Sequence, residues 1–162
     1  MSLDTPARPR AVRAAGIALI VAPILALVVK SCSFGWMMAL LLMLVIPVLL
    51  LLLGYALQLV IALGSLLRHR GALRHAANAS RAVSAAWVTS IGVVLTALLM
   101  YDGGDQTAGS TLTLMLAMAS DGQTESVSGV VTLVTGAVWL GGWVWLVVEW
   151  LIALAQRRRA AA

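Results

Sequence analysis

Charged residues and cysteines are both scarce in this chain, and each scarcity narrows what the protein can be. Charged residues make up 10% of its 162 residues, whereas soluble domains contain about 25%. Cys32 is the single cysteine, so the chain cannot close a disulfide within itself or hold a metal with several thiolates. The composition therefore excludes an ordinary water-soluble domain and a disulfide-stabilised one.

Motifs that carry catalysis or metal binding are also missing. The sequence has no HExxH helix, no glycine-rich phosphate loop and no Ser/His/Asp set, so we expect no enzyme, no metal site and no cofactor. His69 and His75 are six residues apart, which does not place two ligands on one helical face. The acidic residues between 102 and 125 lack the spacing of a calcium loop, and we interpret them as solvated turns.

Long uncharged runs dominate the remainder of the sequence. The longest extends from Trp36 to Leu67, and its 32 residues would form a helix of about 48 Å, longer than the ~30 Å hydrocarbon core of a bilayer. A run inside a membrane must be helical, because no water is present there to satisfy its backbone amides. We expect Pro23 and Pro47 to kink the first and second helices, since proline removes one backbone hydrogen bond.

These runs predict an all-α integral membrane protein, a single four-helix transmembrane bundle over residues 14–156. The expected segments are a basic tail 1–13, spans at about 14–33, 36–67, 82–101 and 127–154, a basic loop 68–81, an acidic outer loop 102–126 and a basic C-terminus 157–162. Asn78 and Ser80 are available to cap the third helix.

The distribution of charge predicts the topology. Ten of the eleven basic residues fall in the tail, the loop 68–81 and the C-terminus, whereas four of the six acidic residues fall in the loop 102–126. By the positive-inside rule, both termini are cytoplasmic in a multi-pass protein of a bacterial inner (plasma) membrane. A fifth span would place Arg157 outside, so we predict that Thr111–Ala119 is a short interfacial or re-entrant helix.

Lys30 is the basic residue that this topology leaves on the outer side. We expect it to reach the outer interface with its amine while its stem stays in the bilayer. A cleaved lipoprotein signal, with Cys32 lipidated, is a weaker alternative, because a cleavage region requires small neutral residues and Lys30 is neither.

The basic loop and the C-terminus indicate contact with anionic lipid headgroups on the cytoplasmic face. The candidate contacts are Arg68, Arg70, Arg74, Arg81, Arg157, Arg158 and Arg159. Nucleic-acid binding is not expected, because no aromatic residues alternate with these arginines as single-strand binding would require.

Small residues and tryptophans mark candidate packing faces. Small side chains spaced four apart let membrane helices approach closely, and tryptophans within a span offer surface for a partner helix. The candidate face residues are Ala14, Ala18, Ala22 and Ala26 in the first helix, Ser128, Thr132 and Gly136 in the last, and Trp139, Trp143 and Trp145 beyond them.

Glu149 is the one acidic residue inside a predicted span. Intramembrane acids often mark ion or proton pathways, but a carboxylate near a helix end also pairs readily with a neighbouring cation. Arg13, Arg81 or a partner subunit could supply that cation, and we favour pairing over transport.

The sequence alone thus predicts a non-enzymatic accessory or assembly subunit, which packs against itself as a homo-oligomer or against a larger membrane complex. The alternative is a small oligomeric channel or transporter with Glu149 as a titratable coupling site.

Overall fold

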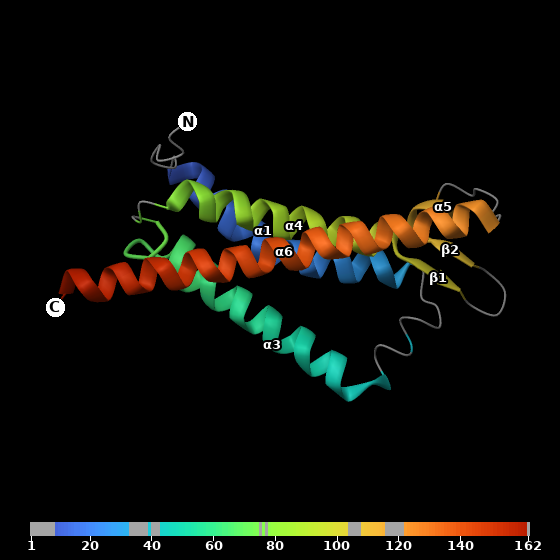
Figure 1. The fold of residues 1–162 in the computed structure, drawn as a ribbon, viewed down its shortest axis with the longest axis horizontal. Helices are drawn as coiled ribbons and strands as arrows, with labels where there is room; N and C mark the ends of the chain where they lie inside the picture. Colours follow the sequence, from blue (N-terminus) through green and yellow to red (C-terminus); the bar gives the residue numbers. More distant parts are fainter. Residues whose placement is uncertain are drawn as a thin grey trace.

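The computed structural model describes residues 9–32, 39, 43–74, 76, 78–103, 108–115 and 122–161. Most of these residues are helical (Figure 1). In chain order the elements are α1 (Pro9–Ser31), α3 (Val45–Ile61), its π-helical continuation η1 (Ala62–Leu67), α4 (Ala79–Leu99), strands β1 (Tyr101–Gly103) and β2 (Ala108–Ser110), α5 (Thr111–Met115) and α6 (Gly122–Ala161).

Four helices in the described part of the chain are long and apolar enough to cross a membrane. They are Pro9–Ser31, Val45–Leu67, Ala79–Leu99 and Val127–Ala160. The protein is therefore mostly helical, with the properties of a multi-pass membrane protein, as the sequence predicts. Both ends of the chain lie at the same end of the molecule (Figure 1).

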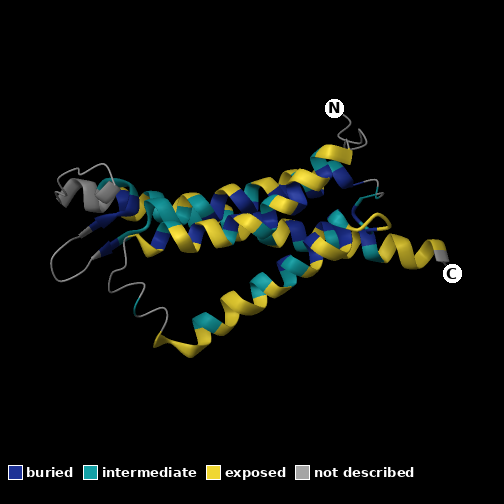
Figure 2. Cartoon of the chain, turned by 180° about the vertical axis from the view of Figure 1, so that it is seen from behind, coloured by how far each residue is buried: buried dark blue, intermediate teal, exposed yellow. Residues whose placement is uncertain are grey.

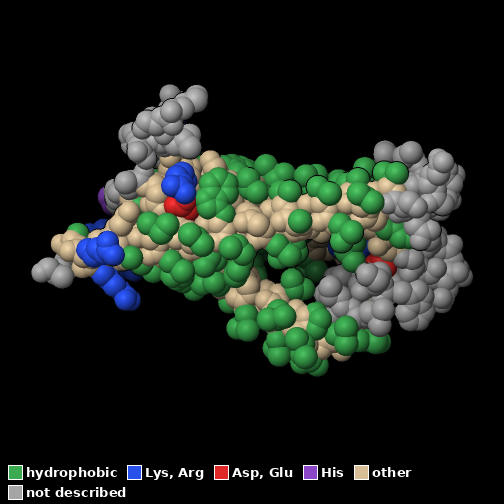
Figure 3. Space-filling view, viewed as in Figure 1, with side chains coloured by type: hydrophobic (Ala, Val, Ile, Leu, Met, Phe, Trp, Pro, Cys, Tyr) green, Lys and Arg blue, Asp and Glu red, His purple; other side chains and the backbone are tan. Residues whose placement is uncertain are grey.

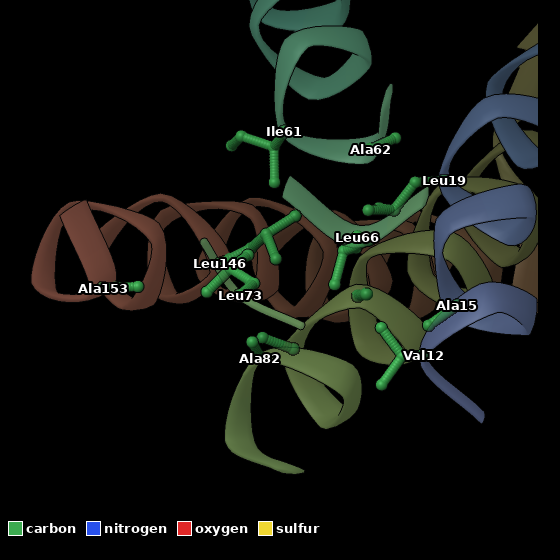
Figure 4. Packing of buried hydrophobic residues seen from close by; sticks show 12 residues of the cluster. Val12, Ala15, Leu19, Ile61, Ala62, Leu66, Leu73, Ala82, Leu146 and Ala153 are labelled. Atoms are coloured by element: carbon green, nitrogen blue, oxygen red, sulfur yellow. The ribbon is translucent and has the colours of Figure 1, made fainter. Parts of the chain in front are cut away.

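Helices α1, α4 and α6 lie side by side and form the body of the molecule (Figure 1). Their buried residues face one another, whereas exposed residues lie on the outward faces (Figure 2), and many of these are leucine, isoleucine and valine. The main core cluster includes Val12 and Leu19 of α1, Ala82 of α4 and Leu146 of α6 (Figure 4). Outward apolar faces of this kind suit a lipid solvent. Lipid chains are as apolar as these side chains, so there is no hydrophobic driving force to bury them in the protein.

Helix α3 departs from this body. Within α3 only Gln58 and Ile61 are buried, both in its last turn, and η1 then adds Ala62 and Leu66 to the core (Figure 4). Leucines along the first half of α3 are exposed, and the space-filling view shows that half standing apart from the other helices (Figure 3). The second span is thus attached to the body mainly through its C-terminal part.

Two polar side chains of α3 attach it to α1 next to a proline. Pro23 has no N–H, so the carbonyl of Leu19, four residues earlier, has no helical donor. Gln58 Nε2 donates to that carbonyl at 2.7 Å, and the Tyr55 hydroxyl donates to the neighbouring carbonyl of Ile20 at 3.1 Å. Gln58 of α3 therefore supplies the donor that the proline removes in α1, and Tyr55 adds a second hydrogen bond one residue further along.

Helix α3 begins at Val45, after an extended Leu44, so Pro47 lies in its first turn and the kink expected within a longer second helix falls at the boundary of the described residues. First-turn N–H groups have no intrahelical acceptor, so a proline is tolerated there. Residues 36–38 and 40–42 of the predicted second span lie outside the described residues.

The end of the molecule opposite the termini carries a hairpin that the sequence analysis did not predict. Strands β1 and β2 pair antiparallel, with Tyr101 opposite Ser110. Helix α5 follows directly, and the Thr111 hydroxyl donates to the carbonyl of Ala97 in α4 at 3.2 Å. The five residues of α5 are too few to cross a membrane. The remainder of the predicted short helix, residues 116–119, lies outside the described residues.

Candidate functional site

Glu149 is the centre of a buried polar cluster between α4 and α6. It lies in α6 and is fully buried, with 0% of its surface exposed. Asn78 and Arg81 reach it from the start of α4, and Trp145 reaches it from one turn earlier in α6. Residues that are far apart in the sequence therefore meet because α4 and α6 pack against each other.

Both carboxylate oxygens of Glu149 accept hydrogen bonds. Oε1 lies 2.9 Å from a guanidinium nitrogen of Arg81 and 3.0 Å from the indole Nε1 of Trp145. Oε2 accepts from Nδ2 of Asn78, which also donates to the Glu149 backbone carbonyl at 3.1 Å. Of the cations considered from the sequence, the structure places Arg81 against this carboxylate.

The position of Asn78 explains why it contacts Glu149. Asn78 is the N-cap residue of α4, and its backbone carbonyl accepts from the N–H of Ala82 at 3.1 Å. Its side chain makes no cap hydrogen bond, contrary to the sequence prediction, and extends across to α6 instead. Free N–H groups give a helix start a partial positive charge, so the carboxylate lies where an anion is favoured.

This arrangement suits a clamp between two helices better than a transport site. Three donors from α4 and α6 hold the Glu149 carboxylate, and it has 0% exposure. A coupling site must exchange its proton or ion with water, whereas a buried carboxylate with three donors is already satisfied. One buried atom of the cluster, Oδ1 of Asn78, has no hydrogen-bond partner within the described structure.

A second buried ion pair lies at the opposite end of the molecule. Lys30 Nζ is 3.5 Å from a carboxylate oxygen of Asp102 and donates to the carbonyl of Met100 at 3.3 Å. Lys30 is 4% and Asp102 is 3% exposed, which corrects two predictions. Lys30 does not extend to solvent and Asp102 is not a solvated turn, because the hairpin brings Asp102 over the end of α1.

The seven arginines predicted to contact lipid lie near the end that carries both termini. Arg68 and Arg70 are exposed, Arg74 is half-buried, and residues 157–159 are exposed at the end of α6. Figure 3 shows basic side chains gathered there. Arg81 differs from the other six, because it is committed to Glu149.

The alanines singled out in α1 do not all lie on one buried face. Ala22 and Ala26 are buried, Ala18 is half-buried and Ala14 is exposed. Four residues turn a helix by about 400°, so a row spaced four apart drifts by about 40° at each step. The buried face instead alternates steps of three and four, and it includes Ala15 and Gly16.

The last helix shows a similar difference. The hydroxyls of Ser128 and Thr132 both donate to the carbonyl of Leu99 at the end of α4, at 2.9 and 3.0 Å. That carbonyl would otherwise lack a donor, because the helix ends there. Gly136, the third member of the row, has no atom within 4 Å of where a Cβ would be.

Two glycines that the sequence analysis missed bring α4 and α6 into close contact. A Cβ on Gly92 would lie 2.8 Å from Trp139 Cα, and one on Gly142 would lie 2.8 Å from Val88 Cγ1 and 3.0 Å from the Thr89 backbone nitrogen. No local sequence signal separates them from Gly136, since the distinction depends on which side of α6 faces α4.

The three tryptophans predicted to form a partner face have different neighbours. Trp139 packs against the cluster of Ala22, Ala26 and Val93. Trp143 is half-buried, and its ring reaches within 4.0 Å of where a Cβ on Gly54 of α3 would be. Trp145 donates its indole hydrogen to Glu149. At least two of the three are therefore engaged within the chain.

No group of three or more His, Cys, Asp or Glu side chains could hold a metal ion within the part of the chain that the structure describes. Cys32 is exposed there.

Comparison with known proteins gives no relative: no family model matches the chain, and no match is found among curated proteins or among solved structures.

Proposed function

We propose that this protein is a non-enzymatic assembly subunit of a membrane complex, and that α3 supplies its docking surface. The observation that carries the proposal is the separation of α3 from the other three helices. Only its last turn is buried, whereas Leu49, Leu50, Leu52 and Leu53 are between 51% and 66% exposed. A transmembrane helix gains stability by packing against other helices, and α3 leaves most of its length free for a second copy or a larger partner.

The proposal includes a topology. The charges at the end with both termini are basic, so the positive-inside rule assigns that end to the cytoplasm and the hairpin to the outer face of a bacterial inner membrane. Helix α5 then lies at the outer interface rather than within the bilayer, since its threonines contact the hairpin and the end of α4.

The transporter alternative has weaker support. It needs Glu149 as an exchangeable site, but three donors within the chain already hold that carboxylate. Enzymatic function has no support from any constellation of side chains described above.

Site-specific cross-linking tests the assembly role. In a Cys32→Ser background, single cysteines replace Leu49, Leu52 and Leu53 of α3, and the controls replace the equally exposed Ile24 and Val28 of α1. We expect the α3 cysteines to cross-link in native membranes, to a second copy or to a larger protein, and the α1 cysteines to cross-link far less.

Native mass spectrometry of the tagged chain, purified in mild detergent, then gives the mass and stoichiometry of the complex. A monomer with no cross-link from any α3 position would contradict the proposal.

A further inference from the structure

A pocket of about 310 Å³ lies between the loop after η1 and the last turns of α6. Arg70 comes from the loop, and Gln156 and Arg157 come from α6, so the lining includes three residues whose side chains carry N–H donors. Ala72 and Ala153 are also in its lining. The pocket thus combines two cations and an amide with a small apolar wall.

The loop that carries Arg70 is fixed in place. Leu73 is fully buried in the main core, and the Gly71 N–H donates to the Arg68 carbonyl at 2.9 Å. A Cβ on Gly71 would collide with the carbonyl oxygen of Ser65 in η1, so the loop lies directly against that helix. Arg70 is therefore presented to α6 by a packed turn.

The charges of the pocket have no counter-ion within the described structure. Neither Arg70 nor Arg157 forms a salt bridge with a described residue, and the pocket lining contains no acidic side chain. This distinguishes them from Arg81, which is neutralised by Glu149. Two arginines without a described counter-ion in the lining of one pocket favour an anion there.

We infer that this pocket binds one phosphate group, carried by an anionic lipid. The planar guanidinium donates paired hydrogen bonds that match phosphate oxygens, so two arginines and an amide satisfy one phosphate well. Ala153 precedes Arg157 by about 6 Å of helix, so along α6 the apolar part of the lining lies toward the middle of the helix and the charged part toward its C-terminus. A lipid presents the same order, with its acyl chains below its phosphate.

The inference does not depend on the assembly role, and it is more specific than general attraction of a basic surface to lipid. Among the exposed arginines that the structure describes at this end, Arg70 and Arg157 line the pocket, whereas Arg68 and Arg158 are their exposed neighbours outside it. Arg68 and Arg70 carry the same charge and lie close together in the sequence, and so do Arg157 and Arg158. The neighbours are therefore matched controls.

The test is native mass spectrometry of the full-length protein in mild detergent, titrated with phosphatidylglycerol and, separately, with phosphatidylcholine. We expect Arg70→Gln and Arg157→Gln each to weaken the binding of the first phosphatidylglycerol molecule about tenfold. This is the effect of losing a charge-assisted hydrogen bond. Arg68→Gln and Arg158→Gln should change it by less than about twofold, because an exposed charge is screened.

Competition with inorganic phosphate and glycerol 1-phosphate identifies the source of the phosphate. Failure of both to displace the lipid assigns the site to a lipid headgroup, and displacement at concentrations similar to those of the lipid assigns it to a soluble phosphate ester. Equal losses in all four variants, or no loss in any, would overturn the inference. All four side chains are exposed, so unchanged elution and tryptophan emission are expected and serve as the check on folding.

Discussion

At the scale of single residues, Glu149 shows how a buried acid can be structural. Its carboxylate joins α6 to the start of α4 through Arg81 and Asn78. Arg81 keeps 52% of its side chain exposed, so the cation is partly solvated while the anion is not. The contribution of such a pair comes mainly from satisfying the buried partner, because an exposed guanidinium loses little when it is released.

The first prediction concerns this pair. Glu149→Ala should lower the free energy of unfolding by about 2 kcal/mol, because the Trp145 indole and the Arg81 guanidinium lose their acceptor and Asn78 keeps only its bond to the backbone carbonyl of residue 149. Glu149→Gln retains an acceptor oxygen and should cost less. SDS-induced unfolding followed by far-UV circular dichroism measures both, with the exposed Arg158→Ala as a neutral control.

A double-mutant cycle of Arg81→Ala with Glu149→Ala should give a coupling energy of about 1 kcal/mol. If the two losses simply add, the ion pair contributes nothing and its role as a clamp is wrong.

At the scale of elements, helix packing here depends on backbone groups as much as on apolar area. The proline in α1 frees the carbonyl of Leu19, and Gln58 of α3 supplies the missing donor at 2.7 Å. Pro23, Gln58 and an uncharged environment can all be read from the sequence. Their pairing could not be, because it depends on how α3 is rotated and at what depth it crosses α1.

The second prediction follows from this pairing. Gln58→Leu should cost about 1 kcal/mol in the native chain, the usual size of an interhelical hydrogen bond in a membrane. In a Pro23→Ala background it should cost almost nothing, because the N–H of residue 23 then bonds the Leu19 carbonyl. Unfolding titrations of the native chain, the two single variants and the double variant measure the cost of Gln58→Leu in each background. An equal cost in both backgrounds would show that Gln58 acts by some other contact.

The third prediction separates three glycines that look alike in the sequence. Gly92→Ala and Gly142→Ala should each cost about 1–3 kcal/mol, because the added Cβ meets α6 or α4 at 2.8 Å and the helices must separate. Gly136→Ala meets no atom within 4 Å and should be neutral or stabilise by about 0.5–1 kcal/mol through better helix propensity. The same unfolding titration gives the order, and a loss at Gly136 similar to that at Gly92 would contradict it.

At the scale of the whole molecule, two features determine how the chain meets its surroundings. Exposed leucine, isoleucine and valine residues lie on the outward faces of the helices, which Figure 2 shows as exposed, and basic side chains gather at the end with both termini (Figure 3). The first suits a lipid solvent, and the second is the feature from which the proposed topology assigns that end to the cytoplasm. The separation of α3 then leaves one apolar surface that lipid or a partner helix covers.

The fourth prediction tests the orientation. Cys32 is exposed beyond the end of α1 opposite the termini, so a membrane-impermeant maleimide should label it in intact spheroplasts. In a Cys32→Ser background, Ala160→Cys should be labelled only after permeabilisation, because the proposed topology places the C-terminus inside. The reverse pattern would overturn that topology.

The sequence by itself determined the solvent of this protein and the number of its candidate spans, because apolar runs of 20 residues or more have one stable arrangement in a bilayer. It also placed the arginines together at one end, since four spans alternate in direction. The hydropathy and the charge of a segment are sums over its residues. They are therefore the same however the helix is rotated about its axis.

Only the tertiary structure decided which side chains meet. Arg81 and not Arg13 pairs with Glu149, Asp102 covers Lys30, and Gly142 rather than Gly136 faces α4. Each outcome depends on the rotation and relative height of two helices. A rotation of 100° exchanges one residue for the next, and lipid exerts little preference among such faces. Close packing between helices, and hydrogen bonds to backbone groups that lack a helical partner, determine which residues meet.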